Sequence, residues 1–365
     1  MRSFPPVSYL AGHTPQSRVS RYFLVCYLLI ILLLSFYPFS GWRYNGEPIF
    51  AFYSYPRPYY FTFFDNFANV MAYVPLGLVL VQWMRRRWFA WPLSVAGGVG
   101  LSASVEFIQQ FLPDRVASNL DILANGAGAV IGATLALFIG SRSWQRRWLV
   151  FRHNYLVPSA ISEWGLVWVG LWYVTQCDPS VPFLGVVVEA VALPQPFVSP
   201  MANARLFLDL LESSGVALHL LGLAMFVAIL VRHQRHVVPA MFGTLAVGLL
   251  LKLLFAGMML KRAEFFAWIN ENVVIGALAG LLLVAVCARL NRRLRALLGA
   301  LSLGAALGVS WAWPLAPQLS ATLSLFRWQY GHLQHFSGMA ALVGDIWPYG
   351  AIAMMLATVF RLWEE

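Results

Sequence analysis

Charged side chains are scarce in this sequence. Asp, Glu, Lys and Arg make up only 11% of its 365 residues, whereas 60% are hydrophobic and the mean hydropathy is +0.68. A soluble globular domain carries roughly a quarter charged residues, and it could not bury this much apolar surface. The shortage of charge therefore excludes a soluble protein and indicates a polytopic membrane protein.

Cysteine is rare, and the common catalytic signatures are missing. Cys26 and Cys287 fall within apolar runs and Cys177 at the end of another, so the thiols do not form a disulfide framework. A phosphate-binding glycine loop, an HExxH pair and a nucleophile elbow are absent. His332 and His335 lie three residues apart, but no further ligand lies near them in sequence, so we predict no metal site and no cofactor.

Long apolar runs dominate what is present. Windows of about 17–25 apolar residues can cross the hydrocarbon core of a membrane. Ten such runs occur, at roughly 21–40, 65–84, 92–111, 120–140, 157–176, 214–231, 238–259, 270–288, 296–315 and 340–361. Helices are expected, because lipid cannot satisfy free backbone groups. The first run follows a polar segment, 1–20, and is expected to stay as a span rather than be cleaved as a signal peptide.

The basic residues indicate the orientation of the chain. Seventeen of the 25 Lys and Arg residues fall in the segments on one side of the predicted membrane, and seven on the other. The positive-inside rule then places both termini in the cytoplasm. We expect a multi-pass protein of the bacterial inner membrane. The net charge of +10 comes from short arginine clusters between apolar runs, so we predict no nucleic-acid partner.

A polar run closes the third apolar window and opens the fourth, and the orientation places it at the outer leaflet. Its members are Glu106, Gln109, Arg115, Ser118, Asp121, Asn125, Gly128 and Gly132. Clustered ionisable residues beside a bilayer usually mark a site. Glu106 and Gln109 share one helix face, and Asp121, Asn125 and the two glycines share another. The simpler alternatives are helix packing by Asn125 and the glycines, and a surface salt bridge between Arg115 and Asp121.

Two halves of the chain match weakly. A shift of 147 residues places Arg85 on Arg232, Pro92 on Pro239, Arg115 on Arg262 and Asn125 on Asn272. Glu106, Gln109 and Asp121 are replaced by Leu253, Ala256 and Trp268, so the second copy is expected to lack the site. Four spans per copy would place the two in parallel orientation.

The first half resembles the VanZ-like family, named for a membrane protein linked to teicoplanin resistance. The resemblance covers roughly residues 20–140, from the first apolar run through Asp65-x3-Asn69-x5-Pro75-x-Gly77 to the run from Glu106 to Gly132. It implies a four-helix membrane module and, through the name of the family, a role in glycopeptide resistance. We therefore expect an all-α protein of about ten transmembrane helices, with two four-helix modules followed by two further spans.

The expected division of the chain has five parts. These are a cytoplasmic segment 1–20, a VanZ-like domain 21–141, a cytoplasmic linker 142–156, a degenerate second module 157–290 and two C-terminal spans 291–365.

The polar run suggests two kinds of chemistry. A guanidinium beside amides suits phosphate or carboxylate, so Arg115, with Gln109, Asn125, Asn69, Asp65 and Ser118, would bind an anionic, lipid-linked envelope or polysaccharide intermediate. Alternatively, Glu106 and Asp121 would divide the acid and base roles of an enzyme acting on such a substrate. Lys252 would either extend to the surface or supply a counter-charge to this site. Membrane lipids are the expected partners, and the oligomeric state stays open.

Overall fold

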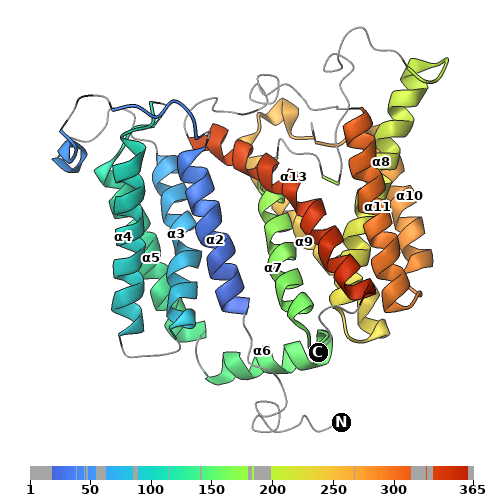
Figure 1. Cartoon of the computed structure of the whole chain (residues 1–365), viewed down its shortest axis with the longest axis horizontal. Coiled ribbons are helices and arrows are strands. Elements are labelled where there is room, and N and C mark those ends of the chain that lie inside the picture. The colour runs from blue at the N-terminus through green and yellow to red at the C-terminus, as the bar shows by residue number, and fades with distance from the viewer. Residues whose placement is uncertain are drawn as a thin grey trace. The chain divides into compact units, whose positions relative to one another are not determined.

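The chain is almost entirely helical where its structure is described. The structure, a computed structural model, describes residues 19–37, 39–44, 46, 48–54, 63–84, 89–113, 115–139, 142–179, 183–184, 199–266, 268–313, 326 and 332–360. These residues form eleven α-helices and two short 3-10 helices (Figure 1). They divide into two compact units, residues 1–150 and 151–365. The prediction of an all-α polytopic membrane protein is confirmed.

Six helices are long and apolar enough to cross a membrane, judged by length and composition within the described residues. They are Asn66–Trp83, Asn119–Ile139, Ala204–Leu230, Gln234–Met259, Arg292–Ala312 and Ala340–Val359. Ser20–Phe36 and Glu271–Cys287 are apolar but shorter. Each of the ten predicted spans overlaps a helix, but a count of ten membrane crossings stays a prediction.

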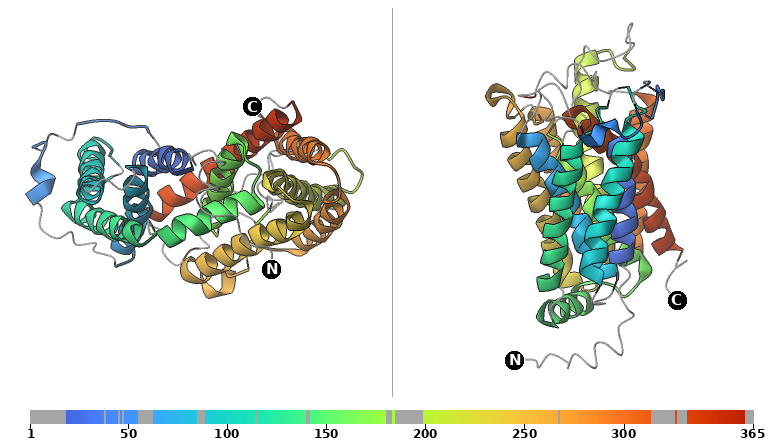
Figure 2. Two further views of the ribbon diagram at one scale, coloured as in Figure 1. Left: turned by 90° about the horizontal axis from the view of Figure 1, so that it is seen from below. Right: turned by 90° about the vertical axis from the view of Figure 1, so that its left-hand side faces the viewer.

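Unit 1 is built from α2 (Val19–Phe36), α3 (Phe63–Trp83), α4 (Ala90–Gln109) and α5 (Asn119–Ile139). The left view of Figure 2, which looks along the helices, shows the four grouped together. The largest contact is between α3 and α5. These two run in the same direction, since Gly128 meets Val70 and Gly132, one turn later, meets Val74. We name the end of the unit where α2 and α4 finish and α3 and α5 begin the site end.

Glycine explains how α3 and α5 approach so closely. A Cβ atom on Gly128 would overlap the carbonyl oxygen of Val70, and one on Gly132 would overlap that of Val74. Small residues allow helix backbones to pack in direct contact within membranes. The two glycines therefore pack α5 against α3, as the sequence predicted. Their contacts also set the height at which the polar residues of α3 and α5 face each other.

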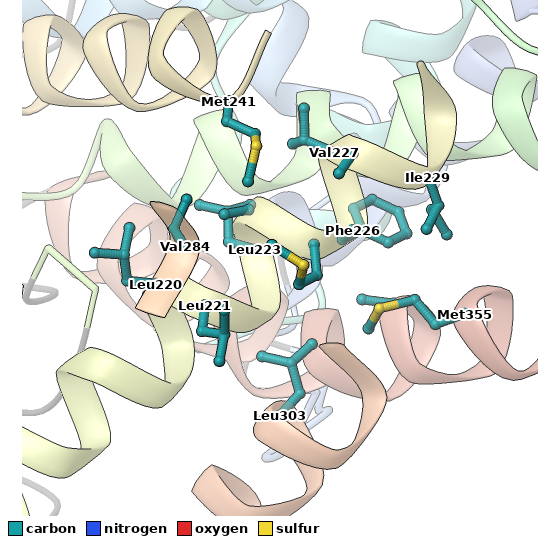
Figure 3. Close-up of a cluster of buried hydrophobic side chains, with 14 of the residues drawn as sticks. Leu220, Leu221, Leu223, Phe226, Val227, Ile229, Met241, Val284, Leu303 and Met355 are labelled. Atoms are coloured by element: carbon teal, nitrogen blue, oxygen red, sulfur yellow. The ribbon is translucent and has the colours of Figure 1, made fainter. Parts of the chain in front are cut away.

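Unit 2 is organised around α8 (Ala204–Leu230). From Val216 to Leu230 its residues are buried, apart from two that are partly exposed. A helix that is apolar all round is a core helix. Its neighbours are α7 (Ala160–Gln176), α9 (Gln234–Met259), α10 (Glu271–Cys287), α11 (Arg292–Ala312) and α13 (His332–Val359). Figure 3 shows Leu220, Leu223 and Phe226 of α8 among Met241, Val284, Leu303 and Met355 of these neighbours.

The segment predicted as a linker, 142–156, forms the helix α6 (Arg142–Tyr155). Its last turn belongs to unit 2. There the guanidinium of Arg152 forms a buried ion pair with Glu163 of α7, with 2.6 Å between Nη2 and Oε1. The backbone N–H of Arg232 donates to the carbonyl of Tyr155 at 2.8 Å. These contacts join the end of α6 to the beginning of α7 and the turn after α8.

Candidate functional site

Glu106 lies at the junction between α4 and α5. Its side chain is only 3% exposed, and its Oε2 accepts a hydrogen bond of 2.8 Å from the backbone N–H of Ser118. The hydroxyl of Ser118 accepts in turn from Leu120 N at 3.2 Å. Helix N-termini carry free N–H groups that need acceptors, and the carboxyl oxygen of Glu106 supplies one. Glu106 therefore joins the end of α4 to the beginning of α5.

Gln109 and Arg115 both donate to the end of α2. The amide Nε2 of Gln109 lies 3.0 Å from the carbonyl oxygen of Ser35, and Arg115 Nη2 donates to the carbonyl of Leu34. The last carbonyls of a helix have no partner within the helix, and cationic side chains stabilise that end. Both residues thus make a structural contact with α2, in addition to the ligand-binding role that the sequence suggested for them.

Charged groups gather around Glu106. Asp121, in the first turn of α5, and Arg115 are the charged residues that act electrostatically on its carboxyl group. Asp121 is half-buried, in contrast to Glu106. The structure therefore brings Glu106, Gln109, Arg115, Ser118 and Asp121 to one end of unit 1. Asp65 lies in the first turn of α3, but its side chain is outside the described part.

One turn deeper lies a buried polar layer between α3, α4 and α5. Asn125 Nδ2 donates to the hydroxyl of Ser102 at 2.9 Å, and both side chains are buried. Tyr73, 4% exposed, lies against Gly98 of α4 and Gly128 of α5, and an added Cβ at Gly128 would come within 3.0 Å of the Tyr73 Cβ. Because helical side chains tilt toward the N-terminus, its hydroxyl points toward the site end. Ser102 of α4 is the polar side chain nearest in effect to this hydroxyl, although the two make no hydrogen bond of good geometry, and Glu106 and Asp121 both act on it electrostatically.

Three atoms of this layer lack the hydrogen bonds that they could make. Asn69 Nδ2, Tyr73 Oη and Asn125 Oδ1 are closed to solvent and have no hydrogen-bond partner among the described residues. Most buried polar atoms in proteins are paired, and each exception calls for an explanation. Leaving one unpaired costs about 1–3 kcal/mol. The site end of unit 1 is therefore polar, buried and incompletely satisfied.

Sequence reasoning missed Tyr73 and Ser102. Both could have been found from spacing, since Tyr73 is one turn after Asn69 and Ser102 is one turn before Glu106, so each pair lies on one helix face. An aromatic residue or a serine within an apolar window carries no signal by itself, and for that reason neither was singled out.

Unit 2 has a polar cluster of its own, which sequence reasoning also missed. At the beginning of α8 and α10, Asn270 Nδ2 donates to Glu212 Oε1 at 2.7 Å. Asn272 Nδ2 donates to Asp209 Oδ1 at 2.9 Å and to Glu212 Oε2 at 3.0 Å. Asn272 is the residue aligned with Asn125 by the 147-residue shift. The carboxylates were overlooked because α8 begins ten residues before the predicted apolar window.

Lys252 does not extend to the surface, so that alternative was wrong. It is completely buried in unit 2, and its Nζ donates to the backbone carbonyl of Asp178 at 2.6 Å.

The side chains of His332 and His335 lie outside the described residues. Within the described residues, no three His, Cys, Asp or Glu side chains come together as a possible metal site.

Comparison with known proteins agrees with the predicted resemblance. Residues 22–140, which contain α2 to α5, match the family model VanZ/LLP1. No curated protein and no solved structure was found to match the chain. The VanZ/LLP1 match therefore includes every predicted site residue, whereas the degenerate copy in the second half stays a prediction.

Proposed function

We propose that the site end of unit 1 binds the polar headgroup of an anionic, lipid-linked intermediate of the cell envelope or its polysaccharides. In this proposal unit 1 lies in the bacterial inner membrane, with both chain termini in the cytoplasm and the site end at the outer leaflet. The observation that carries it is the set of unsatisfied atoms on Asn69, Tyr73 and Asn125, next to Glu106.

The unsatisfied atoms indicate the chemistry of the ligand. Asn69 Nδ2 and Tyr73 Oη can donate, so they call for acceptor oxygens, whereas Asn125 Oδ1 accepts and calls for a hydroxyl. A phosphate-linked sugar carries both kinds of group. Arg115 adds positive charge at the same end, which favours the phosphate. Because the three atoms are closed to solvent, a headgroup reaches them only when side chains at the site end move aside.

The membrane setting supports this interpretation. A residue whose buried polar atom has no partner lowers stability, and such residues within membrane helices are commonly functional. A lipid anchor would hold the headgroup at the level of the site end, between helices whose outer surfaces are apolar. Teicoplanin resistance would be one consequence if the bound intermediate were a wall precursor.

Tyr73→Phe tests the proposal, because it removes one unsatisfied hydroxyl and leaves the ring in place. We expect native mass spectrometry of gently purified wild-type protein to show a phosphate-containing lipid adduct. In the variant the abundance of this adduct should fall at least tenfold. The unliganded variant should be as stable as wild type, or more stable by about 1 kcal/mol, because a buried orphan group is gone.

Tyr27→Phe is the matched control. The hydroxyl of Tyr27, on α2 in the same unit, donates to the carbonyl of Ala72 at 2.7 Å. Its loss should lower stability by about 1 kcal/mol and leave the adduct unchanged. A wild-type protein that carries no such lipid, or an adduct that survives Tyr73→Phe, would show that the layer is structural.

An enzymatic role is the second candidate, and the unlike surroundings of Glu106 and Asp121 favour it. The first carboxyl is buried and bonded to Ser118, whereas the second is half-buried. Such a difference in environment lets two carboxyl groups divide acid and base roles. The substrate would be the same lipid-linked intermediate.

Glu106→Gln separates the enzyme from the binder. Glutamine keeps an oxygen that can accept from Ser118, but it cannot exchange a proton. For an enzyme, turnover of the co-purified lipid should fall about 10²–10⁴-fold while the adduct persists, since general acid–base catalysis contributes about that much. Product analysis of the lipid by mass spectrometry measures this. Absence of any turnover by wild-type protein would leave binding as the function.

A further inference from the structure

Six arginines lie at one end of unit 2, where α8 and α10 finish and α9 and α11 begin. They are Arg232, Arg235, Arg289, Arg292, Arg293 and Arg295. The sequence has no acidic residue between Glu212 and Glu264, nor between Glu271 and Asp345. No carboxylate from these stretches can therefore offset the arginines, and Glu163, at the beginning of α7, already forms an ion pair with Arg152. We name this surface the arginine face.

Hydrogen bonds hold the two turns that carry these arginines together. Gln234, between Arg232 and Arg235, donates through Nε2 to the carbonyl of Ala288, which precedes Arg289. Its Oε1 accepts from Arg295 Nη2 at 2.7 Å. The turn after α8 and the turn after α10 are thus joined side chain to backbone. The backbone segments that carry the arginines therefore lie side by side on one surface.

Two of the six extend inward to the end of α8. Arg292 Nε lies 2.9 Å from the carbonyl of Ile229, and Arg295 Nη1 lies 3.3 Å from that of Ala228. Arg295 is only 6% exposed, forms no ion pair with a carboxylate of the described residues, and its Nε has no hydrogen-bond partner there. A buried cation without a counter-ion is costly, so an anion close to this face would be stabilised.

The other four arginines are exposed, and exposed apolar side chains lie beside them. Leu282 and Val286 at the end of α10 are 71% and 73% exposed, and Phe242 near the beginning of α9 is 54% exposed. Arginines at the end of membrane helices therefore border surfaces suited to acyl chains. A soluble polyanion such as a nucleic acid would use the charges but not the apolar surface. An anionic amphiphile would use both.

We propose that the arginine face binds the phosphate headgroups of anionic phospholipids in preference to zwitterionic ones. The proposal does not depend on the ligand of unit 1, because it concerns another unit and a different set of residues. Orientation by positive charge explains why arginines occur in these segments. Orientation alone does not explain why the two turns are hydrogen-bonded to each other, or why Arg295 is buried without a counter-ion among the described residues. Basic surfaces at helix ends bind anionic headgroups in this way.

The test is a lipid titration of the full-length protein in detergent, followed by native mass spectrometry. Phosphatidylglycerol and phosphatidylcholine with the same acyl chains are the two probes, with inorganic phosphate as a third. We expect wild-type protein to bind phosphatidylglycerol at least tenfold more tightly than phosphatidylcholine. The double variant Arg235→Gln with Arg293→Gln changes two exposed arginines. It should weaken the binding of phosphatidylglycerol about 30-fold, since each arginine near anionic lipid contributes about fivefold to the affinity. Phosphatidylcholine binding should not change.

The matched control removes two exposed arginines from the opposite end of unit 2. Arg205→Gln with Arg262→Gln makes the same change in net charge and should leave the lipid preference intact. Equal weakening by both double variants would show a general charge effect and overturn the proposal. So would a wild-type protein without preference between the lipids, or equal binding of inorganic phosphate. If the Arg235 and Arg293 variant does not fold, loss of the wild-type preference in high salt gives the same decision.

Discussion

Lys252→Met is expected to destabilise unit 2 by about 3–5 kcal/mol, which is the penalty for removing one partner of a buried charged pair. Lys252 is completely buried on α9, and its ammonium donates to the backbone carbonyl of Asp178. The carboxyl group of Asp178, also fully buried, acts on the ammonium electrostatically. Without the lysine, the buried carboxyl group of Asp178 would lose the cationic side chain that acts on it. Denaturant unfolding in detergent measures the change.

Two further variants decide whether charge is the cause. Lys252→Met combined with Asp178→Asn removes both charges and should recover a substantial part of the loss, because no uncompensated ion is left. Lys261→Met changes the other lysine of the chain, which is exposed, and should stay within about 0.5 kcal/mol of wild type. If Lys252→Met behaved like Lys261→Met, the buried pair would contribute nothing to stability.

Gly132→Ala should have the second large effect, a loss of about 3 kcal/mol in unit 1. The added methyl group would overlap the carbonyl oxygen of Val74 and lie 2.9 Å from the backbone nitrogen of Leu78. Backbone atoms cannot rotate away as a side chain can, so α3 and α5 must separate. Overpacking a closely packed contact typically costs about 1–3 kcal/mol, and more where nothing can yield. Thermal unfolding in detergent checks this result.

Gly100→Ala makes the same chemical change on α4, where nothing lies within 4 Å of the new methyl group. There alanine should stabilise the helix by about 0.5–1 kcal/mol, because it restricts the unfolded chain more than glycine does. The two variants should therefore move stability in opposite directions. Because the Gly132 contact sets the level of α3 against α5, Gly132→Ala should also disturb the polar layer and reduce lipid adducts. Unchanged stability in Gly132→Ala would mean that the helices are not in contact.

The candidate site was only partly readable from sequence. Glu106, Gln109, Arg115, Ser118 and Asp121 were expected to converge, since they flank a short turn between two helices, and the structure gathers them at one end. Spacing along the chain cannot show what a donor contacts, however. Gln109 and Arg115 donate to carbonyls of α2, more than 70 residues away in sequence. Tyr73 is buried because it packs against glycines of two other helices, Gly98 and Gly128.

The sequence by itself determined the helical fold, the approximate position of every described α-helix except α6, and the VanZ-like resemblance of the first half. These follow from local properties: apolar runs must form helices in lipid, and polar residues on one helix face are recognisable by their period. Only the tertiary structure decided which buried polar atoms have partners. The pairing of Lys252 with Asp178, the carboxylates at the start of α8 and the unsatisfied layer around Tyr73 all depend on contacts between distant helices. Hydropathy windows discard the polar turns at helix ends, and no spacing rule within one helix specifies its neighbour.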